Sequence, residues 1–396
     1  MRLVLGAYNL DLPGGGATYF ATVAEHVQRL GHDVTAYTRE PGAVSGWLEE
    51  RGIAVAGPHN LPDDCEGVLA QDAATSYDLA ERYPHTGQVF VAHGVEFEFE
   101  QPPHVPGVVS KVVVLNDRVR QAVATTTVEV EVVRLRQPVD TSRFQPRIDL
   151  AASPRRAVLL GNYLKGPRRD AVTSALDAAG VRWVQLGRTG KVSDDPSPAL
   201  AEADVVIGYG RSILEGMACG CAAYVAEFAV DGWVTADTYP AMEANGFAGT
   251  AFEVPPDADR LARDLAEYDP TMGIVNRELA ATRHTAHEHA KSLVALLENV
   301  DPRPAVVRHA ADMSRLVRME WDARLRAGWH KGKLADMHRR ALAAEERAAS
   351  AERRAVEAER RALEAEGRFG EIKRSARYRL AQRLAAPLDA ARFWRR

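Results

Sequence analysis

Short apolar runs alternate with helical patterns along the first part of the chain. The earliest run, residues 3–5, ends at Gly6, and a Gly-rich stretch at residues 13–16 precedes a helix predicted from about Ala17 to Leu30. Further strands are predicted at residues 33–38, 67–70, 88–92, 111–115 and 129–135, which are rich in apolar and β-branched residues. Strands that alternate with helices predict a mostly parallel sheet covered on both faces.

A second series of the same kind follows a polar stretch, residues 147–154, that has the composition of a linker. Its strands are predicted at residues 157–160, 181–186, 204–207 and 222–225, with helices at 168–179 and 212–218. We therefore predict two α/β domains, residues 1–146 and 155–300. Ligands of open α/β sheets bind at the carboxyl ends of the strands, so a cleft between the domains is the expected site.

The pattern becomes helical from about Leu261, and from Ala344 to Phe369 apolar residues are spaced alternately four and three apart. This spacing favours a coiled coil, through which the chain could form a homo-oligomer. A single solvated helix held by Glu/Arg pairs fits equally well, because alanine buries little area. We predict a helical connector at residues 301–343, a heptad helix at 344–370 and a basic amphipathic tail at 371–396.

The formal net charge of −4 conceals an asymmetry between the two parts of the chain. Residues 301–396 contain 24 basic and 14 acidic residues, and residues 372–396 contain eight basic residues and one acidic residue. A basic segment with apolar residues at helical spacing suits an anionic membrane surface. A helix packed on another part of the protein is the alternative. Nucleic acid is disfavoured because the acidic body would repel it.

The three cysteines, Cys65, Cys219 and Cys221, support neither a disulfide framework nor a zinc module. No run of 18 apolar residues occurs, and the apolar start, Met1–Tyr8, is too short for the core of a signal peptide. We therefore expect a cytoplasmic protein.

The segment with the most chemical information is residues 203–220. A strand ends in a turn that contains Gly208 and Gly210, and a helix follows with Arg211 and Ser212 at its start. Unpaired N–H groups at a helix start suit a phosphate, and Arg211 would add a full positive charge. Glu215 lies one turn into the helix, where it could accept hydrogen bonds from sugar hydroxyls. A simpler interpretation is that the glycines only permit tight packing of the strand against the helix.

This segment resembles the signature of retaining glycosyltransferases of family 4, Glu-Gly-Phe-Gly-x-x-x-x-Glu-Ala-Met-Ala-x-Gly. The residues that match it are Gly208, Tyr209, Gly210, Glu215, Met217, Ala218 and Gly220. The resemblance implies that Glu215 binds the ribose of a nucleotide-sugar donor. The family's first glutamate, associated with the donor sugar, is replaced by Ile207 in this chain.

Other segments resemble the same family in the same order. Residues 13–17 and 30–34 are similar to its amino-terminal Gly-rich loop, helix and strand, which implies that Gly15 and Gly16 face the donor phosphates and the acceptor. Residues 113–120 and 137–144 resemble the family's strand and helix before the linker and its crossover between the domains.

The family's diphosphate-binding arginine and lysine fall on Asn162 and Lys165 in this chain. Arg168 and Arg169 follow in the next helix, so three cations could neutralise a diphosphate. A solvated helix face is the alternative for this cluster. His93, at a strand end, is the candidate for the wall of the donor-sugar pocket and for catalysis, with Asp72 as a further candidate.

The resemblance implies an α/β fold of GT-B type, in which two Rossmann-like domains face a cleft, here followed by a long helical, coiled-coil tail. It implies a retaining, metal-independent, hexosyltransferase-like enzyme that moves a sugar from a nucleotide-sugar to an acceptor hydroxyl, with no other cofactor. Lipid-linked or glycan acceptors of cell-surface synthesis and a peripheral membrane position are the implied context. Ile207 and Asn162 favour an alternative, a non-catalytic nucleotide-sugar-binding or scaffolding protein. A nucleotide-sugar epimerase is a further, disfavoured option.

Overall fold

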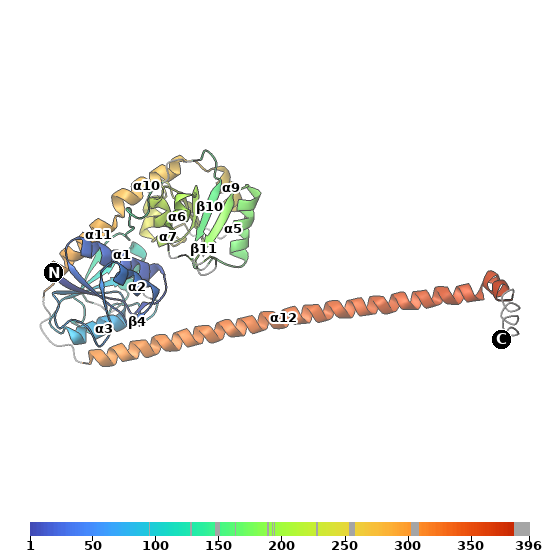
Figure 1. The fold of residues 1–396 in the computed structure, drawn as a ribbon, viewed down its shortest axis with the longest axis horizontal. Coiled ribbons are helices and arrows are strands. Elements are labelled where there is room, and N and C mark those ends of the chain that lie inside the picture. Colours follow the sequence, from blue (N-terminus) through green and yellow to red (C-terminus); the bar gives the residue numbers. More distant parts are fainter. Residues whose placement is uncertain are drawn as a thin grey trace. The chain divides into compact units, whose positions relative to one another are not determined.

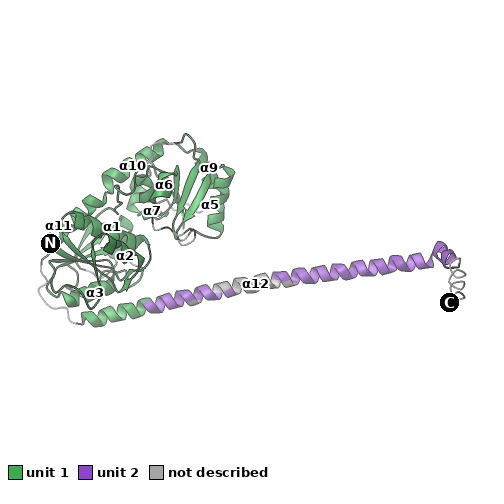
Figure 2. Ribbon diagram, viewed as in Figure 1, with its two compact units in different colours: residues 1–321 green, residues 322–396 purple. Residues whose placement is uncertain are grey.

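The computed structural model describes most of the chain, namely residues 1–94, 96–126, 129–146, 151–162, 164–187, 190–191, 193, 195–226, 229–252, 258–301 and 309–383. It divides into two compact units, residues 1–321 and 322–396 (Figure 2). The last part of the predicted basic tail, residues 384–396, lies outside the described residues.

The first sheet has seven parallel strands in the order β5-β3-β1-β6-β7-β8-β9. In chain order these strands are β1 (Arg2–Gly6), β3 (Asp33–Tyr37), β5 (Ala54–Ala56), β6 (Gly67–Ala70), β7 (Gln88–Ala92), β8 (Lys111–Val114) and β9 (Glu131–Arg134). A small parallel pair, β2 (Asn9–Leu10) and β4 (Glu40–Pro41), lies outside the sheet. The apolar runs predict six of the seven strands of this sheet, because a parallel sheet buries both of its faces, whereas β5 was not predicted.

Helices cover both faces of this sheet. The helices between its strands are α1 (Gly15–Arg29), α2 (Ala43–Glu50), α3 (Ala73–Arg82) and α4 (Asp117–Val123). Leu3 and Leu5 of β1 pack in one core with α1 and α2, whereas Val4 packs with α3 in a core on the opposite face. Alternation of side chains along a strand explains this division.

The second sheet has five strands in the order β11-β10-β12-β13-β14, of which only β14 is antiparallel to its neighbour. Its strands are β10 (Arg156–Leu160), β11 (Arg182–Leu186), β12 (Val205–Gly208), β13 (Ala222–Ala226) and β14 (Val230–Trp233). The helices of this domain are α5 (Pro167–Ala178), α6 (Ser197–Ala201), α7 (Arg211–Ala218), α8 (Tyr239–Ala244), α9 (Ala258–Ala266) and α10 (Thr271–Arg283). Val206 packs with α7 on one face, and Ile207 packs with α5 and α9 on the other.

The chain then returns to the first domain through α11 (Ala286–Glu298). Leu293 and Leu297 of α11 join the core formed by β1 and α1. Helix α12 (Ala310–Arg374) begins on the same domain, where Ser314 donates a 2.6 Å hydrogen bond to Asp78 of α3. Helix α11 and the start of α12, residues 310–321, therefore complete the first domain, although they follow the second domain in sequence.

The second unit consists mainly of the remainder of α12. This helix is uninterrupted from Ala310 to Arg374, so it includes most of the predicted connector and the whole predicted heptad segment, residues 344–370 (Figure 1). The predicted helical tail is confirmed for these residues, whereas the coiled coil stays a prediction. In the part of the chain that the structure describes, no helix is long and apolar enough to cross a bilayer.

Candidate functional site

Two adjoining pockets lie between the α/β domains of the first unit. The first has a volume of about 250 Å³ and the second about 260 Å³. Both are lined by the start of α1, the end of β10 and the start of α7, through Gly15, Gly161, Asn162, Arg211 and Ser212. These elements meet at the carboxyl ends of parallel strands, which is where the sequence predicts the site.

The turn between β12 and α7 shows two different uses of glycine. A side chain at Gly208 would place its Cβ 2.4 Å from the carbonyl oxygen of Leu160, so this glycine permits close strand packing. Gly210 has open space around its Cβ position, but its φ of 56° lies in the left-handed region. The turn directs the first residues of α7, Arg211 and Ser212, to the pockets.

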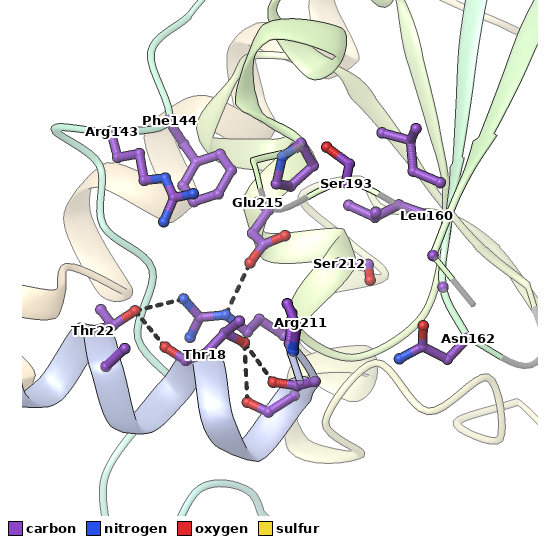
Figure 3. A pocket seen from close by; sticks show the side chains of 18 of the residues that line it. Thr18, Thr22, Arg143, Phe144, Leu160, Asn162, Ser193, Arg211, Ser212 and Glu215 are labelled. Carbon is purple, nitrogen blue, oxygen red and sulfur yellow. Dashed lines mark hydrogen bonds and ion pairs between the residues drawn. The ribbon is translucent and has the colours of Figure 1, made fainter. Parts of the chain in front are cut away.

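Arg211 connects the two domains. Its Nε donates a 2.9 Å hydrogen bond to Oε1 of Glu215, one turn along α7. Its Nη2 donates to the Thr22 hydroxyl of α1 at 2.8 Å (Figure 3). Its Nη1 donates to the Pro138 carbonyl at 3.2 Å. The guanidinium is therefore already bonded to both domains and to the crossover between them, while it also lines both pockets.

Glu215 has one carboxylate oxygen on Arg211, and the other points away from Arg211 into the pocket (Figure 3). The side chain is only 11% exposed, and burial raises the pKa of this carboxyl, although the Arg211 charge opposes the shift. An oxygen so placed can accept hydrogen bonds from a ligand's hydroxyl groups.

The opposite wall of the first pocket is the amino-terminal part of α1. Gly14, the residue before the helix, provides no side-chain cap, and Thr18 donates its hydroxyl to the Gly14 carbonyl at 2.8 Å. Gly15 lines both pockets and Gly16 the second, and neither has an atom within 3.4 Å of its Cβ position. Backbone can therefore be approached closely at this helix start.

The predicted cation cluster is not brought together at the pockets. Lys165 and Arg168 are exposed and are not among the described residues that line either pocket. Arg169 donates to Gln185 at 2.8 Å and lies over the Trp183 ring. Asn162, the replacement for the family's arginine, does line both pockets.

His93 lines the second pocket at the end of β7. Its Nε2 lies 3.1 Å from Oε1 of Gln71, and its ring meets the Tyr19 ring edge-on at 4.7 Å. Burial, followed by the Arg211 charge, lowers the pKa of His93 to about 4. The imidazole is therefore neutral near pH 7 and can serve as a hydrogen-bonding group.

Asp72 has a structural position in this fold. Its carboxylate caps α3 by accepting from the Thr75 amide at 2.8 Å, and it also accepts from the Tyr8 amide at 2.7 Å. It is not among the described residues that line the two pockets.

Cations that the sequence reasoning missed lie in the first pocket. Arg143 lies in the crossover and pairs with Asp195 at 3.1 Å, and Arg51 pairs with Glu25 at 3.1 Å. Arg143 belongs to the crossover segment that resembles the family, and this was the available signal. Arg51 comes from α2's C-terminal end, far from any motif, so only the fold places it here.

The described residues contain no group of three or more His, Cys, Asp or Glu side chains arranged to hold a metal ion. The hydrogen-bonding groups of the pockets instead include backbone amides at two helix starts, two carboxylates, hydroxyl and amide side chains, arginines and an imidazole. Such a set suits a ligand that combines phosphate with hydroxyl groups.

Comparisons by sequence find neither a matching protein-family model nor a matching curated protein. Comparisons by structure do find matches. HepE from Anabaena, in complex with UDP and glucose, has a TM-score of 0.56 at 13% identity, covering 76% of this chain and 100% of that chain. A glycosyltransferase from Rickettsia africae has a TM-score of 0.53 at 14% identity, covering 75% of this chain and 98% of that chain.

WaaG, a glycosyltransferase involved in lipopolysaccharide biosynthesis, has a TM-score of 0.51 at 14% identity, covering 75% of this chain and 100% of that chain. The chain has the GT-B fold. The predicted fold class is thereby confirmed, and at these identities the likeness extends to the fold alone. In the GT-B fold of this chain, Glu215 and His93 lie in neighbouring pockets on either side of Arg211.

Proposed function

We propose that this protein is a glycosyltransferase that moves a sugar from a nucleotide-sugar donor to an acceptor hydroxyl. The observation that carries the proposal is the Glu215 carboxylate, which presents one oxygen to a pocket between the two domains of a GT-B fold. HepE, which shares the fold, holds UDP and glucose, and this supports the donor class.

The proposed roles follow from position. Glu215 accepts hydrogen bonds from the ribose hydroxyls, and the helix start at Gly210, Arg211 and Ser212 faces the diphosphate. Arg143, in the same pocket, adds positive charge that stabilises the departing nucleotide. Gly15 and Gly16 form the facing wall.

The neutral imidazole of His93 hydrogen-bonds the transferred sugar from the second pocket. Lys165 and Arg168, with Gly208 as a packing residue, remain in the proposed donor-binding set because of the resemblance. Neither cation reaches the pockets in this structure, so both have a subordinate role in the proposal.

Retention of the anomeric configuration and independence from metal are proposed from the resemblance of residues 208–220 to family 4. Retention is tested by proton NMR of the first product formed from a donor of defined configuration. Transfer that persists in excess EDTA supports metal independence, and its loss with recovery on adding a divalent ion opposes it.

A second candidate function is non-catalytic binding of a nucleotide-sugar. It is favoured by Ile207, which is fully buried in the core and presents no carboxylate, and by Asn162 in place of a phosphate-binding arginine. In this case the donor binds but is not turned over.

A panel of nucleotide-sugars, assayed for binding and for nucleotide release with and without lipid and glycan acceptors, separates the two functions. The informative variant is Glu215→Gln, and the matched control is Glu202→Gln, an exposed glutamate of the same domain that pairs with Arg156 at 2.7 Å. If nucleotide-sugar binding weakens in Glu215→Gln but not in Glu202→Gln, the result supports the proposed donor site at Glu215. Wild-type binding without turnover by any donor supports the non-catalytic alternative.

We further propose a cytoplasmic location with the basic tail at an anionic membrane surface, where lipid-linked acceptors of glycan synthesis would be available. Support comes from exposed Lys373, Arg374, Arg377, Arg379 and Arg383 beside exposed Ile372 and Leu380. Flotation with anionic and neutral vesicles tests it: full-length protein should float with anionic vesicles, and a chain ending at Leu342 should float less. Equal flotation of both would remove the tail from membrane binding.

A further inference from the structure

The four-three apolar spacing of α12 is longer than the alanine repeat alone. It includes twelve positions, which we call the seam: residues 334, 337, 341, 344, 348, 351, 355, 358, 362, 365, 369 and 372. Leu334 and Met337 begin it, alanines fill the middle, and Phe369 and Ile372 lie near its end. In heptad notation, residues 348, 355 and 362 are a positions, and 351, 358 and 365 are d positions.

The residues on the two sides of the seam have opposite charges. The position before each a residue, g, is arginine at residues 340, 347, 354, 361 and 368. The position after each d residue, e, is glutamate at residues 345, 352, 359 and 366. One row of arginines and one row of glutamates thus border the apolar stripe throughout its alanine part.

Over residues 351–369, whose side chains the structure describes, the single chain leaves this stripe exposed and its glutamate row without ion pairs. Residues 351–369 are all exposed, and the seam residues Phe369 and Ile372 are 55% and 54% exposed. Within the described part of α12, Glu352, Glu359 and Glu366 form no ion pair with another side chain. The pairs that do form, such as Arg361 with Glu357, use glutamates outside the e row.

We propose that α12 forms a parallel, in-register coiled coil with α12 of a second copy of this chain. In that arrangement each g residue lies beside the e residue five positions further along the partner helix. Arg347, Arg354 and Arg361 then face glutamates 352, 359 and 366 of the partner subunit. By two-fold symmetry the same pairs form on the other side of the seam.

The same charges exclude the antiparallel arrangement. There, g residues face g residues and e residues face e residues, so arginine would lie against arginine and glutamate against glutamate along the whole contact. Like charges at facing positions are destabilising. The orientation therefore follows from the two uniform rows, independently of how strongly the alanines pack.

The alanine seam favours two helices over three. Small side chains let two backbones approach closely and fill the narrow space between them. A third helix would widen the central space, which a methyl group cannot fill, and the lining atoms would lose their contacts. The contact extends over roughly 57 Å between residues 334 and 372 at 1.5 Å per residue, so its length offsets the small area that each alanine buries.

The register ends where the helix ends. In the parallel pair, Arg368 of one chain would lie beside Lys373 of the second copy, which is a like-charged pair. Helix α12 ends at the next residue, Arg374. Ser375 then accepts from the Tyr378 amide at 3.2 Å, which starts a new turn. A parallel pair also places Lys373, Arg374 and the following arginines of both chains at the same end of the coiled coil.

The first test is the mass of the full-length protein in solution by light scattering. Twice the 43.3 kDa of one chain is expected, and one chain's mass or three times it at micromolar concentration overturns the proposal. This result is independent of glycosyl transfer, since it uses neither donor nor acceptor.

Charge exchange tests orientation. Arg347→Glu/Arg354→Glu/Arg361→Glu and Glu352→Arg/Glu359→Arg/Glu366→Arg should each raise the dimer dissociation constant by at least ~100-fold, because three attractive pairs on each side become repulsive. The combination of all six substitutions restores opposite charges in a parallel pair and should return the dimer. Failure of the sixfold variant to recover, or unchanged affinity in the single-row variants, overturns the parallel orientation.

Disulfide trapping tests register. Ala365→Cys, at a d position away from the middle of the seam, should form a linked dimer on mild oxidation. Arg360→Cys, on the opposite face, is the matched control and should not. Wild-type protein gives the background from Cys65, Cys219 and Cys221, of which the last two are buried. A dimeric Ala365→Cys protein that does not link overturns the in-register pairing.

Discussion

Replacement of Glu215 should affect both folding and ligand binding, because its two carboxylate oxygens have different tasks. One oxygen accepts from Arg211 at 2.9 Å, and the other faces the first pocket. Glu215→Ala removes both contacts, whereas Glu215→Gln keeps an acceptor for the Arg211 guanidinium but removes the negative charge. The two variants therefore separate the hydrogen bond from the charge.

The expected loss of stability can be worked from the contacts. The Arg211 and Glu215 side chains are 8% and 11% exposed, so their interaction is screened little by water. A hydrogen bond between charged groups contributes about 1.5–3 kcal/mol, and breaking a buried pair by removing one partner costs about 3–5 kcal/mol. Arg211 keeps Thr22 and Pro138 as acceptors in the variants. We therefore expect the free energy of unfolding to fall by about 2–3 kcal/mol in Glu215→Ala and by about 1 kcal/mol in Glu215→Gln.

The expected loss of affinity is separate. If the pocket-facing oxygen accepts from one or two ribose hydroxyls, its removal costs about 1.5–3 kcal/mol, or roughly 10–100-fold in the dissociation constant of a nucleoside diphosphate. Urea unfolding measures the first quantity, and titration calorimetry at a temperature where all variants are folded measures the second. Glu202→Ala, which removes an exposed ion pair with Arg156, is the control. It should change the free energy of unfolding and the free energy of nucleotide binding by less than about 1 kcal/mol each.

Two results would refute this reasoning. If Glu215→Ala binds the nucleoside diphosphate as tightly as wild type, the carboxylate does not contact the donor. If Glu215→Ala loses no more stability than Glu202→Ala, the pair with Arg211 does not hold the cleft in the form described, and the geometry behind the proposal fails.

Three further predictions concern the same cleft and the core around it. Thr22→Val removes the α1 acceptor of Arg211 while keeping its shape, and should cost about 1.5–3 kcal/mol in urea unfolding; a loss equal to that of an exposed Thr→Val change would contradict the bridge. Ile207→Glu restores the family's residue at a fully buried site, and should cost more than about 3 kcal/mol rather than improve transfer, as measured by unfolding and nucleotide release. Burial lowers the pKa of His284 to about 4 in the folded state, so the stability that its neutral form contributes is lost as the pH falls from about 6.5 towards 4. His284→Gln should reduce the dependence of the unfolding free energy on pH in this window by up to ~1.4 kcal/mol per pH unit, and an unchanged slope would contradict the shift.

Elements that depend on local pattern could be predicted from the sequence. The parallel strands of both sheets, apart from the short edge strand β5, were predicted as short apolar runs, because burial on two faces favours such runs. Strand β14 was missed because it lacks such an apolar run. Its residues, Val-Asp-Gly-Trp at 230–233, form no apolar run, and it is an edge strand paired on one side only.

Features that depend on distant contacts could not be predicted. The start of α7 was identified as part of the site, but Arg211's bond to Thr22 joins residues 189 positions apart. Nothing in the local sequence of α11 indicates that it returns to the first domain, since an amphipathic helix can pack on either sheet. The exposure of Lys165 and Arg168 likewise depends on the direction of the turn before α5.

The arrangement around Arg211 links ligand binding to the contact between the domains. Arg211 bonds α1, the crossover and Glu215 together, and Glu215 is the residue proposed to hold the donor. Any ligand that draws the Glu215 carboxylate into the pocket weakens or reorients its bond to Arg211, and any change at Thr22 alters the carboxylate that the ligand meets. Because such coupling is reciprocal, the free energy by which a donor changes the interdomain contact must equal that by which the contact changes donor affinity. If Glu215 holds the donor as proposed, the buried pair of Arg211 and Glu215 therefore couples donor binding to the contact between the domains.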